Sequence, residues 1–153
     1  EEIIMPIKTF RGLIADDTQD TIVLHTNDGS TGYRIVKFEI LPFTPGDVNQ
    51  DSTVQIWKVK QTAVVQTIDF SDNHLLAAAT YASDDPTFSN NDSRAVIFDR
   101  EIFNQDIYIT HQDQASGALS INYYIELEQV KLDLGENTVA TLKDIRNTKT
   151  QGF

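Results

Sequence analysis

Residues 119–134, LSINYYIELEQVKLDL, carry the pattern that most restricts how this chain can fold. From Leu119 to Leu127 apolar side chains occupy the odd positions and mostly polar ones lie between them, which is typical of a half-buried strand. After Leu127 the apolar positions are even: Val130, Leu132 and Leu134. A strand with one buried face cannot change phase without a bulge or a break. We therefore expect residues 119–127 to face the core and residues 130–134 to pack elsewhere, against the C-terminal segment or a neighbouring subunit.

A second alternating region has the composition of a β-hairpin. The runs TIVLHT (21–26) and YRIVKFEIL (33–41) flank the sequence NDGSTG, in which Asp28-Gly29 tolerates positive φ angles. These features predict an antiparallel pair. In the second run the apolar positions change parity between Ile35 and Val36, as they do after Leu127. Two such changes indicate strands that bend from one sheet toward another.

Five further segments have strand character and are separated by turn-forming residues. They are residues 8–15, 53–60, 74–82, 94–99 and 106–110, with a weaker run at 63–70. In the first of them Phe10 and Leu13 are expected to point inward. Residues 74–82, HLLAAATYA, could form a helix by alanine propensity, but neighbouring strands favour a strand there. Residues 135–147 suit either a short amphipathic helix or a last strand.

About eight strands at short spacing predict one all-β domain over residues 1–153. The expected fold is a jelly-roll-like antiparallel β-sandwich, with a short C-terminal helix as an option. An α/β fold would need long periodic helices between the strands, and the sequence has none.

Composition excludes several classes of partner and site. The chain has 23 acidic and 12 basic residues, a net charge of -11, which disfavours nucleic acid and anionic membranes. It contains no cysteine, so disulfides and thiolate metal sites are excluded. The N-terminus is acidic, and no apolar run approaches the roughly 20 residues of a membrane span. Because MPIKTF would make a natural start, residues 1–4 are expected to be an extension, a product of processing or a cloning remainder.

The best metal candidate is the loop GDVNQDST (46–53). Asp47, Asn49 and Asp51 have the spacing of the first three ligands of a calcium loop. Ser52 replaces the glycine of that pattern, however, and Lys58 stands where the closing carboxylate belongs. The three histidines, His25, His74 and His111, show no metal-ligand spacing. We therefore predict no metal and no cofactor.

Catalytic patterns are missing as well. A glycosidase needs two opposed carboxylates, but Glu126 and Glu128 lie on the same face of one strand. There is no GxSxG motif and no phosphate-binding glycine loop. We predict that the protein is not an enzyme and name no catalytic residue.

Aromatic side chains are the better binding candidates. Trp57, Tyr81, Tyr108 and Tyr124 could form a platform for sugar rings or for a protein partner. Tyr124 lies on the polar face of its strand, between Asn122 and Glu126. We therefore predict Trp57, Tyr108 and Tyr124 as interface residues.

Four sequences together resemble a family of small virion-associated proteins of marine tailed bacteriophages. They are MPIKTFRG (5–12), NDGSTGYRIVKFEI (27–40), DIYITHQD (106–113) and INYYIELEQVKLDLGENTVATLKDIRNT (121–148). The resemblance spans nearly the whole chain. It implies a component of the phage particle and no catalytic residues.

From this resemblance we expect a capsid decoration or cement protein. We expect it to be a homotrimer that binds the major capsid protein or other virion proteins. A tail or neck component is the alternative within the same class. A jelly-roll carbohydrate-binding module for host-surface recognition, with Trp57 and the tyrosines stacking on sugars, is the alternative from another class.

Overall fold

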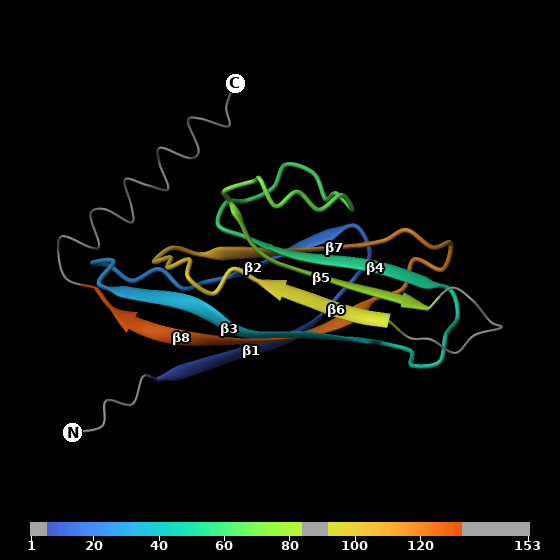
Figure 1. Ribbon diagram of the computed structural model, residues 1–153, viewed down its shortest axis with the longest axis horizontal. Helices are drawn as coiled ribbons and strands as arrows, with labels where there is room; N and C mark the ends of the chain where they lie inside the picture. Colours follow the sequence, from blue (N-terminus) through green and yellow to red (C-terminus); the bar gives the residue numbers. More distant parts are fainter. Residues whose placement is uncertain (1–5, 84–91, 133–153) are drawn as a thin grey trace.

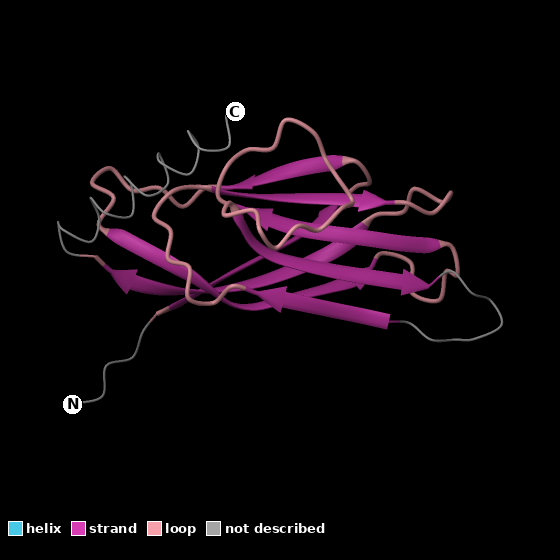
Figure 2. Ribbon diagram, turned by 45° about the horizontal axis from the view of Figure 1, so that its top comes forward, coloured by secondary structure: helices cyan, strands magenta, loops and turns pink. Residues whose placement is uncertain are grey.

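The computed structural model describes residues 6–83 and 92–132, which form eight β-strands connected by loops (Figures 1 and 2). The strands are β1 (Ile7–Ile14), β2 (Thr18–Ile22), β3 (Thr31–Pro42), β4 (Gln50–Trp57), β5 (Leu75–Ser83), β6 (Asp92–Ile97), β7 (Ile107–Asp113) and β8 (Ile121–Lys131). They form a three-stranded sheet of order β1-β8-β3 and a five-stranded sheet of order β2-β7-β4-β5-β6. All pairs are antiparallel.

The two sheets pack face to face, so the predicted all-β sandwich is confirmed (Figure 1). The pairs β1–β8, β2–β7 and β4–β5 are nested in the order of a jelly roll. A regular jelly roll would also pair β6 with β3. Here β6 pairs with β5 instead, which makes the sheets unequal and leaves β3 as an edge strand.

β8 supplies the centre of the core from the smaller sheet. Ile121, Ile125 and Leu127 are fully buried and face the five-stranded sheet. Tyr123 lies between them and packs on its register partner Gly12, where an added Cβ atom would come within 2.8 Å of the tyrosine hydroxyl. Because only glycine leaves that room, β1 can lie flat against β8 beside a large buried ring.

The change of phase near Leu127 does not break β8, so this part of the prediction is wrong. β8 is continuous to Lys131, and the bulge lies in β3, where the register shifts between Ile35 and Lys37. The phase change predicted at Ile35 and Val36 corresponds to this bulge, but β3 and β8 each stay within the three-stranded sheet, so the predicted bend from one sheet toward another is wrong. Leu127 is buried in the core and Val130 is half-buried, while Leu132 packs beside Gly32 and Ile102, outside the main cluster. Leu134 lies outside the described residues.

The predicted hairpin of residues 21–26 and 33–41 is also wrong. β2 pairs with β7 in the larger sheet, whereas β3 pairs with β8 in the smaller one. The turn chemistry is nevertheless present: Gly29 has φ 66°, and the Asp28 carboxylate accepts a hydrogen bond from the Ser30 amide. The connection thus crosses between the sheets, because burying both apolar faces outweighs local pairing of neighbouring strands.

Two other expectations concern single elements. Leu13 is 48% exposed, and the inward residue is Ile14, because Phe10, Gly12 and Ile14 share one face of β1. Residues 74–82 do form a strand, β5, whose Ala77 and Ala79 lie in the core opposite larger side chains.

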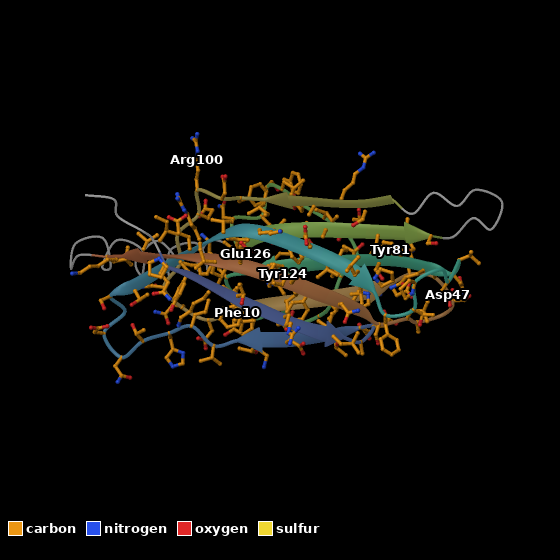
Figure 3. The ribbon with its side chains drawn as sticks, turned by 90° about the horizontal axis from the view of Figure 1, so that it is seen from below. Phe10, Asp47, Tyr81, Arg100, Tyr124 and Glu126 are labelled. Carbon is orange, nitrogen blue, oxygen red and sulfur yellow. The ribbon has the colours of Figure 1, made fainter. Side chains whose placement is uncertain are left out.

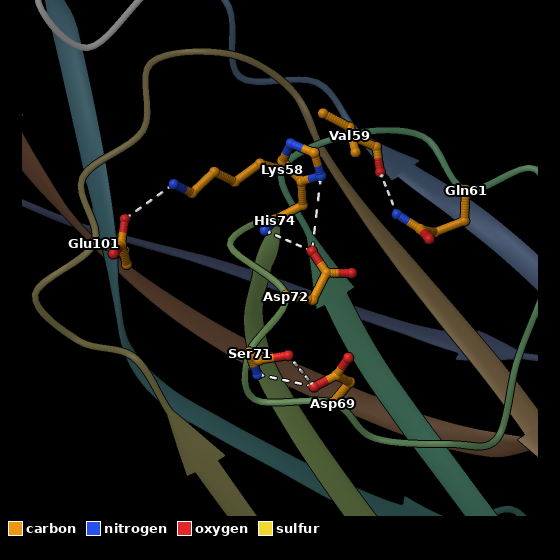
Figure 4. Close-up of polar contacts among 8 residues, drawn as sticks. All are labelled: Lys58, Val59, Gln61, Asp69, Ser71, Asp72, His74 and Glu101. Atoms are coloured by element: carbon orange, nitrogen blue, oxygen red, sulfur yellow. Dashed lines mark hydrogen bonds and ion pairs between the residues drawn. The ribbon is translucent and has the colours of Figure 1, made fainter. Parts of the chain in front are cut away.

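Residues 63–70 form no strand and belong to a loop that covers the outer face of β4. The Gln55 amide donates to the carbonyl oxygens of Val65 (3.3 Å) and Thr67 (3.1 Å). Further bonds within and beside this loop join Asp69 to Ser71, Val59 to Gln61, and Lys58 to Glu101 (Figure 4). Gln55 and Trp57 are consequently buried although they point away from the core.

Residues 135–147, predicted as a helix or a strand, lie outside the described residues. In the described ranges, no helix has the length and apolar character needed to cross a bilayer.

Candidate functional site

The outer face of the three-stranded sheet is the candidate functional site, and we call it the open face (Figure 3). Strand register places its side chains in four rows that run across β1, β8 and β3. The rows are Leu13–Asn122–Leu41, Arg11–Tyr124–Glu39, Thr9–Glu126–Lys37 and Ile7–Glu128–Arg34. The first is largely apolar, and each of the others holds at least one charged group.

A groove of about 480 Å³ lies over the first two rows. Its walls include Leu13 and Leu41, which are 48% and 68% exposed, and Tyr124 forms part of its lining. Phe43, just beyond β3, is 60% exposed near this end of the sheet. Leu13 on β1 and Leu41 on β3 lie on either side of Asn122 of β8, so exposed apolar side chains border the groove on two sides. Exposed apolar side chains gathered at a groove are typical of a surface that binds another molecule.

Tyr124 is held in place by its neighbours on the open face. Its hydroxyl donates a 2.7 Å hydrogen bond to the Glu126 carboxylate, and the Lys37 ammonium lies 5.9 Å from the centre of its ring. The hydrogen bond to Glu126 raises the pKa of the tyrosine, and burial and the charges of Glu126 and Glu39 add to this shift. Tyr124 therefore presents a fixed, neutral ring between two walls of the groove.

The fourth row of the open face contains an ion pair between β3 and β8. The Arg34 guanidinium binds the Glu128 carboxylate through two nitrogens, at 2.9 to 3.1 Å. This two-point geometry holds both side chains in one conformation. Glu128 is therefore a partner of Arg34, while Glu126 lies in the neighbouring row of the same strand face.

Charge on the open face is balanced, unlike that of the whole chain. Its cations are Arg11, Arg34 and Lys37, and its anions are Glu39, Glu126 and Glu128. The face is therefore neutral, and the entire net charge of -11 belongs to the rest of the chain.

Inside the sandwich, the structure forms a serine–histidine contact that sequence spacing did not indicate. His111 Nε2 lies 2.8 Å from Ser52 Oγ, and its Nδ1 lies 3.2 Å from the Ile14 and Ala15 carbonyl oxygens. Burial lowers the pKa of His111, so the ring is neutral at pH 7. Both side chains are 0% exposed. A substrate cannot reach them, and the pair serves to satisfy polar groups in the core.

The predicted aromatic platform is wrong as a single surface. Trp57 is 3% exposed and donates its indole N–H to Thr110 Oγ1 at 3.0 Å, and Tyr81 is 4% exposed in the core. Tyr108 is half-buried beside Trp57 on the outer face of the larger sheet, on the opposite side of the sandwich from Tyr124. Of the predicted interface residues, only Tyr124 lies on the open face, and its role there stays a prediction.

The calcium-like loop is organised by hydrogen bonds of its own. The Asp47 carboxylate accepts from the Asn49 amide at 2.9 Å, and the Asn49 side chain donates to Ser116. Outside this loop, His25 Nδ1 lies 2.7 Å from the Asp106 carboxylate. Within residues 6–83 and 92–132, no three His, Cys, Asp or Glu side chains are grouped so that they could hold a metal ion.

Comparisons with known proteins give no family. No known family model matches the chain, and no curated protein matches it either. Among solved structures, the chain is similar to a crystal structure of Yersinia pseudotuberculosis-derived mitogen, with 11% identity, a TM-score of 0.34 and coverage of 86% of this chain and 89% of that one. It is also similar to a protein of the disulfide-linked pili of Bacillus endospore appendages, with 10% identity, a TM-score of 0.35 and coverage of 85% and 92%. Both TM-scores lie below 0.5, so neither likeness informs the function of this chain.

Proposed function

We propose that this protein is a non-catalytic structural component of a bacteriophage particle, a decoration protein that binds the outer capsid as a homo-oligomer. The sequence resemblance to virion-associated proteins supports this assignment. The observation on the molecule that supports it most is the open face, a neutral and partly apolar surface on a strongly acidic protein. Its partners are the major capsid protein or other virion proteins, together with further copies of itself.

Electrostatics explain why such a face suits assembly. A charge of -11 keeps separate molecules apart and limits non-specific association. On the open face that repulsion is locally cancelled, and the groove between Leu13 and Leu41 offers apolar area. Association is therefore directed to one surface of the sandwich.

The sugar-binding alternative has less support. It required an accessible Trp57, and that ring is 3% exposed and hydrogen-bonded to Thr110. A tail or neck location within the particle is compatible with the same open face, and copy number distinguishes it from decoration.

The proposed function is tested by mass spectrometry of purified particles, with copies counted against the major capsid protein. Decoration predicts on the order of hundreds of copies per particle, and about a dozen or fewer would assign the protein to the tail or neck. Absence from particles would overturn the virion proposal.

A pair of variants tests the surface. Leu41→Glu adds a charge to the groove wall and should abolish incorporation into particles. Val65→Glu adds the same charge at a residue that is 40% exposed on the covering loop and should leave incorporation unchanged. Equal incorporation of the two variants would show that the open face is not needed for assembly into the particle, whether through capsid contact or through self-association.

A further inference from the structure

We infer that the open face binds the open face of a second copy. The two copies are related by a two-fold axis that is parallel to β8 and lies between their facing three-stranded sheets. This inference rests on the proposed self-association and names the surface and symmetry that produce it. The support comes from the order of side chains in the four rows. After that rotation, the rows of one copy lie opposite complementary side chains of the other.

The rotation places β1 of one copy over β3 of the other and keeps each row opposite itself. In the second row Arg11 then faces Glu39 of the second copy, and Glu39 faces its Arg11, with the two Tyr124 rings between these contacts. Glu39 has a 62% exposed side chain whose nearest cation is Lys37, at 3.8 Å. Arg11 forms no ion pair with any residue of the described part of the chain. Both groups are thus available for a contact between copies.

Neighbouring rows are compatible with the same arrangement. In the first row Leu13 faces Leu41 of the second copy, so apolar surface meets apolar surface. In the third and fourth rows the glutamates of the two copies lie near each other on the axis. Each of these rows also contains one cation per copy, so its net charge in the dimer is zero. Sheets that pack face to face are rotated by about 30°, so the rows nearest the crossing point stay best aligned.

The other two-fold axis, which runs across the strands, gives a poorer match. It reverses the order of the rows and places the Leu13–Asn122–Leu41 row against the row that contains Glu128 and Arg34. Apolar side chains would then cover an ion pair and gain no apolar contact. The arrangement with Arg11 opposite Glu39 is therefore the favoured one.

The size of the face predicts modest affinity. Its four rows present 12 side chains, compared with about 20–30 residues on each side of a standard interface. We expect dimers to form in the micromolar range or above, and more completely where a capsid surface concentrates the protein.

Charge exchange tests the contact in the full-length protein. Light scattering coupled to size exclusion, and sedimentation equilibrium from about 10 µM to 1 mM, should show a monomer–dimer equilibrium. Arg11→Glu and Glu39→Arg should each weaken dimerisation by at least about tenfold, because each places like charges opposite one another. The double variant should restore it to within about threefold of the original protein, since both ion pairs re-form with reversed polarity.

Lys60→Glu is the matched control, because it changes the net charge as Arg11→Glu does but at an exposed residue of the covering loop. It should leave the equilibrium unchanged. A monomer throughout the concentration range, a closed trimer, or a double variant as weak as the single ones would overturn the two-fold contact. Virion copy number is measured separately, so a failed charge exchange with normal incorporation would leave the decoration proposal in place.

Discussion

The outer faces of the two sheets follow the same alternation along their strands but differ in what covers them. On the five-stranded sheet, Gln19, Thr110 and Gln55 form a row across β2, β7 and β4. Gln19 exchanges hydrogen bonds with the backbone of Gln61, and Gln55 binds the carbonyl groups of the same loop. The chain therefore covers the part of this face formed by β2, β7 and β4 with its own residues.

The open face has no such cover among the described residues, and its polar groups bind one another. Tyr124 binds Glu126, and Arg34 binds Glu128, all side chain to side chain along or between neighbouring strands. On the larger sheet, glutamine side chains bind the loop backbone and hold the loop over the sheet. On the open face, charged side chains pair with one another and leave the sheet accessible. The open face is therefore the surface proposed to meet a partner.

The largest expected difference in stability is between variants of two aromatic residues, one on each of these faces. Trp57→Ala should lower the free energy of unfolding by about 3–5 kcal/mol, because it removes a buried ring and its bond to Thr110. Tyr124→Ala should cost less than about 1 kcal/mol, since that ring is half exposed. Urea unfolding followed by circular dichroism measures both, because Trp57 is the only tryptophan and its loss removes the fluorescence signal. Equal losses would mean that the two faces do not differ in burial.

A smaller effect is expected for the ion pairs of the two sides. The Lys58 side chain is 4% exposed and binds Glu101 at 2.9 Å, so Glu101→Ala should lower the free energy of unfolding by about 1.5–3 kcal/mol. Glu39→Ala removes an exposed contact to Lys37 and should change it by less than about 0.5 kcal/mol. Thermal and urea unfolding at low and high salt measure the stability of both variants. A Glu101 variant as stable as the Glu39 variant would contradict the assignment of Lys58 to a buried site.

The pH dependence tests the interior behind the covered face. Burial lowers the pKa of His111, so below its ordinary pKa of about 6.5 the unfolded chain binds a proton that the folded chain does not. Stability from this residue is complete above pH 6.5 and is lost as the pH falls toward the folded pKa. The melting temperature should therefore fall as the pH is lowered from 7.5 to 5. His111→Gln should make this fall smaller. An unchanged slope would show that other groups cause the acid sensitivity.

Part of the site could be predicted from the strand alternation alone. The order Asn122, Tyr124, Glu126 and Glu128 on one face of β8 follows from period two, and so does the burial of the residues between them. Which residues stand beside Tyr124 could not be predicted, because Arg11 and Glu39 reach it through the register of β1 and β3. That register depends on the bulge at Val36, which shifts every later residue of β3 by one position.

The burial of Trp57 shows a second limit of local patterns. Its strand alternates like the others, and an aromatic side chain on the outward face of a strand resembles a binding residue. Residues 58–74, however, fold back over that face, and their alternation is too weak to indicate where they pack. Similarly, the Asp28-Gly29 turn predicts a local hairpin, but its two arms belong to different sheets.

By itself, the sequence determined the class of fold, the inward and outward faces of β8, the bulge in β3 and the acidic charge of the molecule. These properties follow from composition and from spacing along one strand, which depend on near neighbours in the chain. Tertiary structure alone decided which strands pair, which outer face is covered, and that Arg11, Tyr124 and Glu39 form one row. The physical reason is that burial of two apolar faces is a property of the whole sandwich, and it selects pairings between residues that are far apart in sequence.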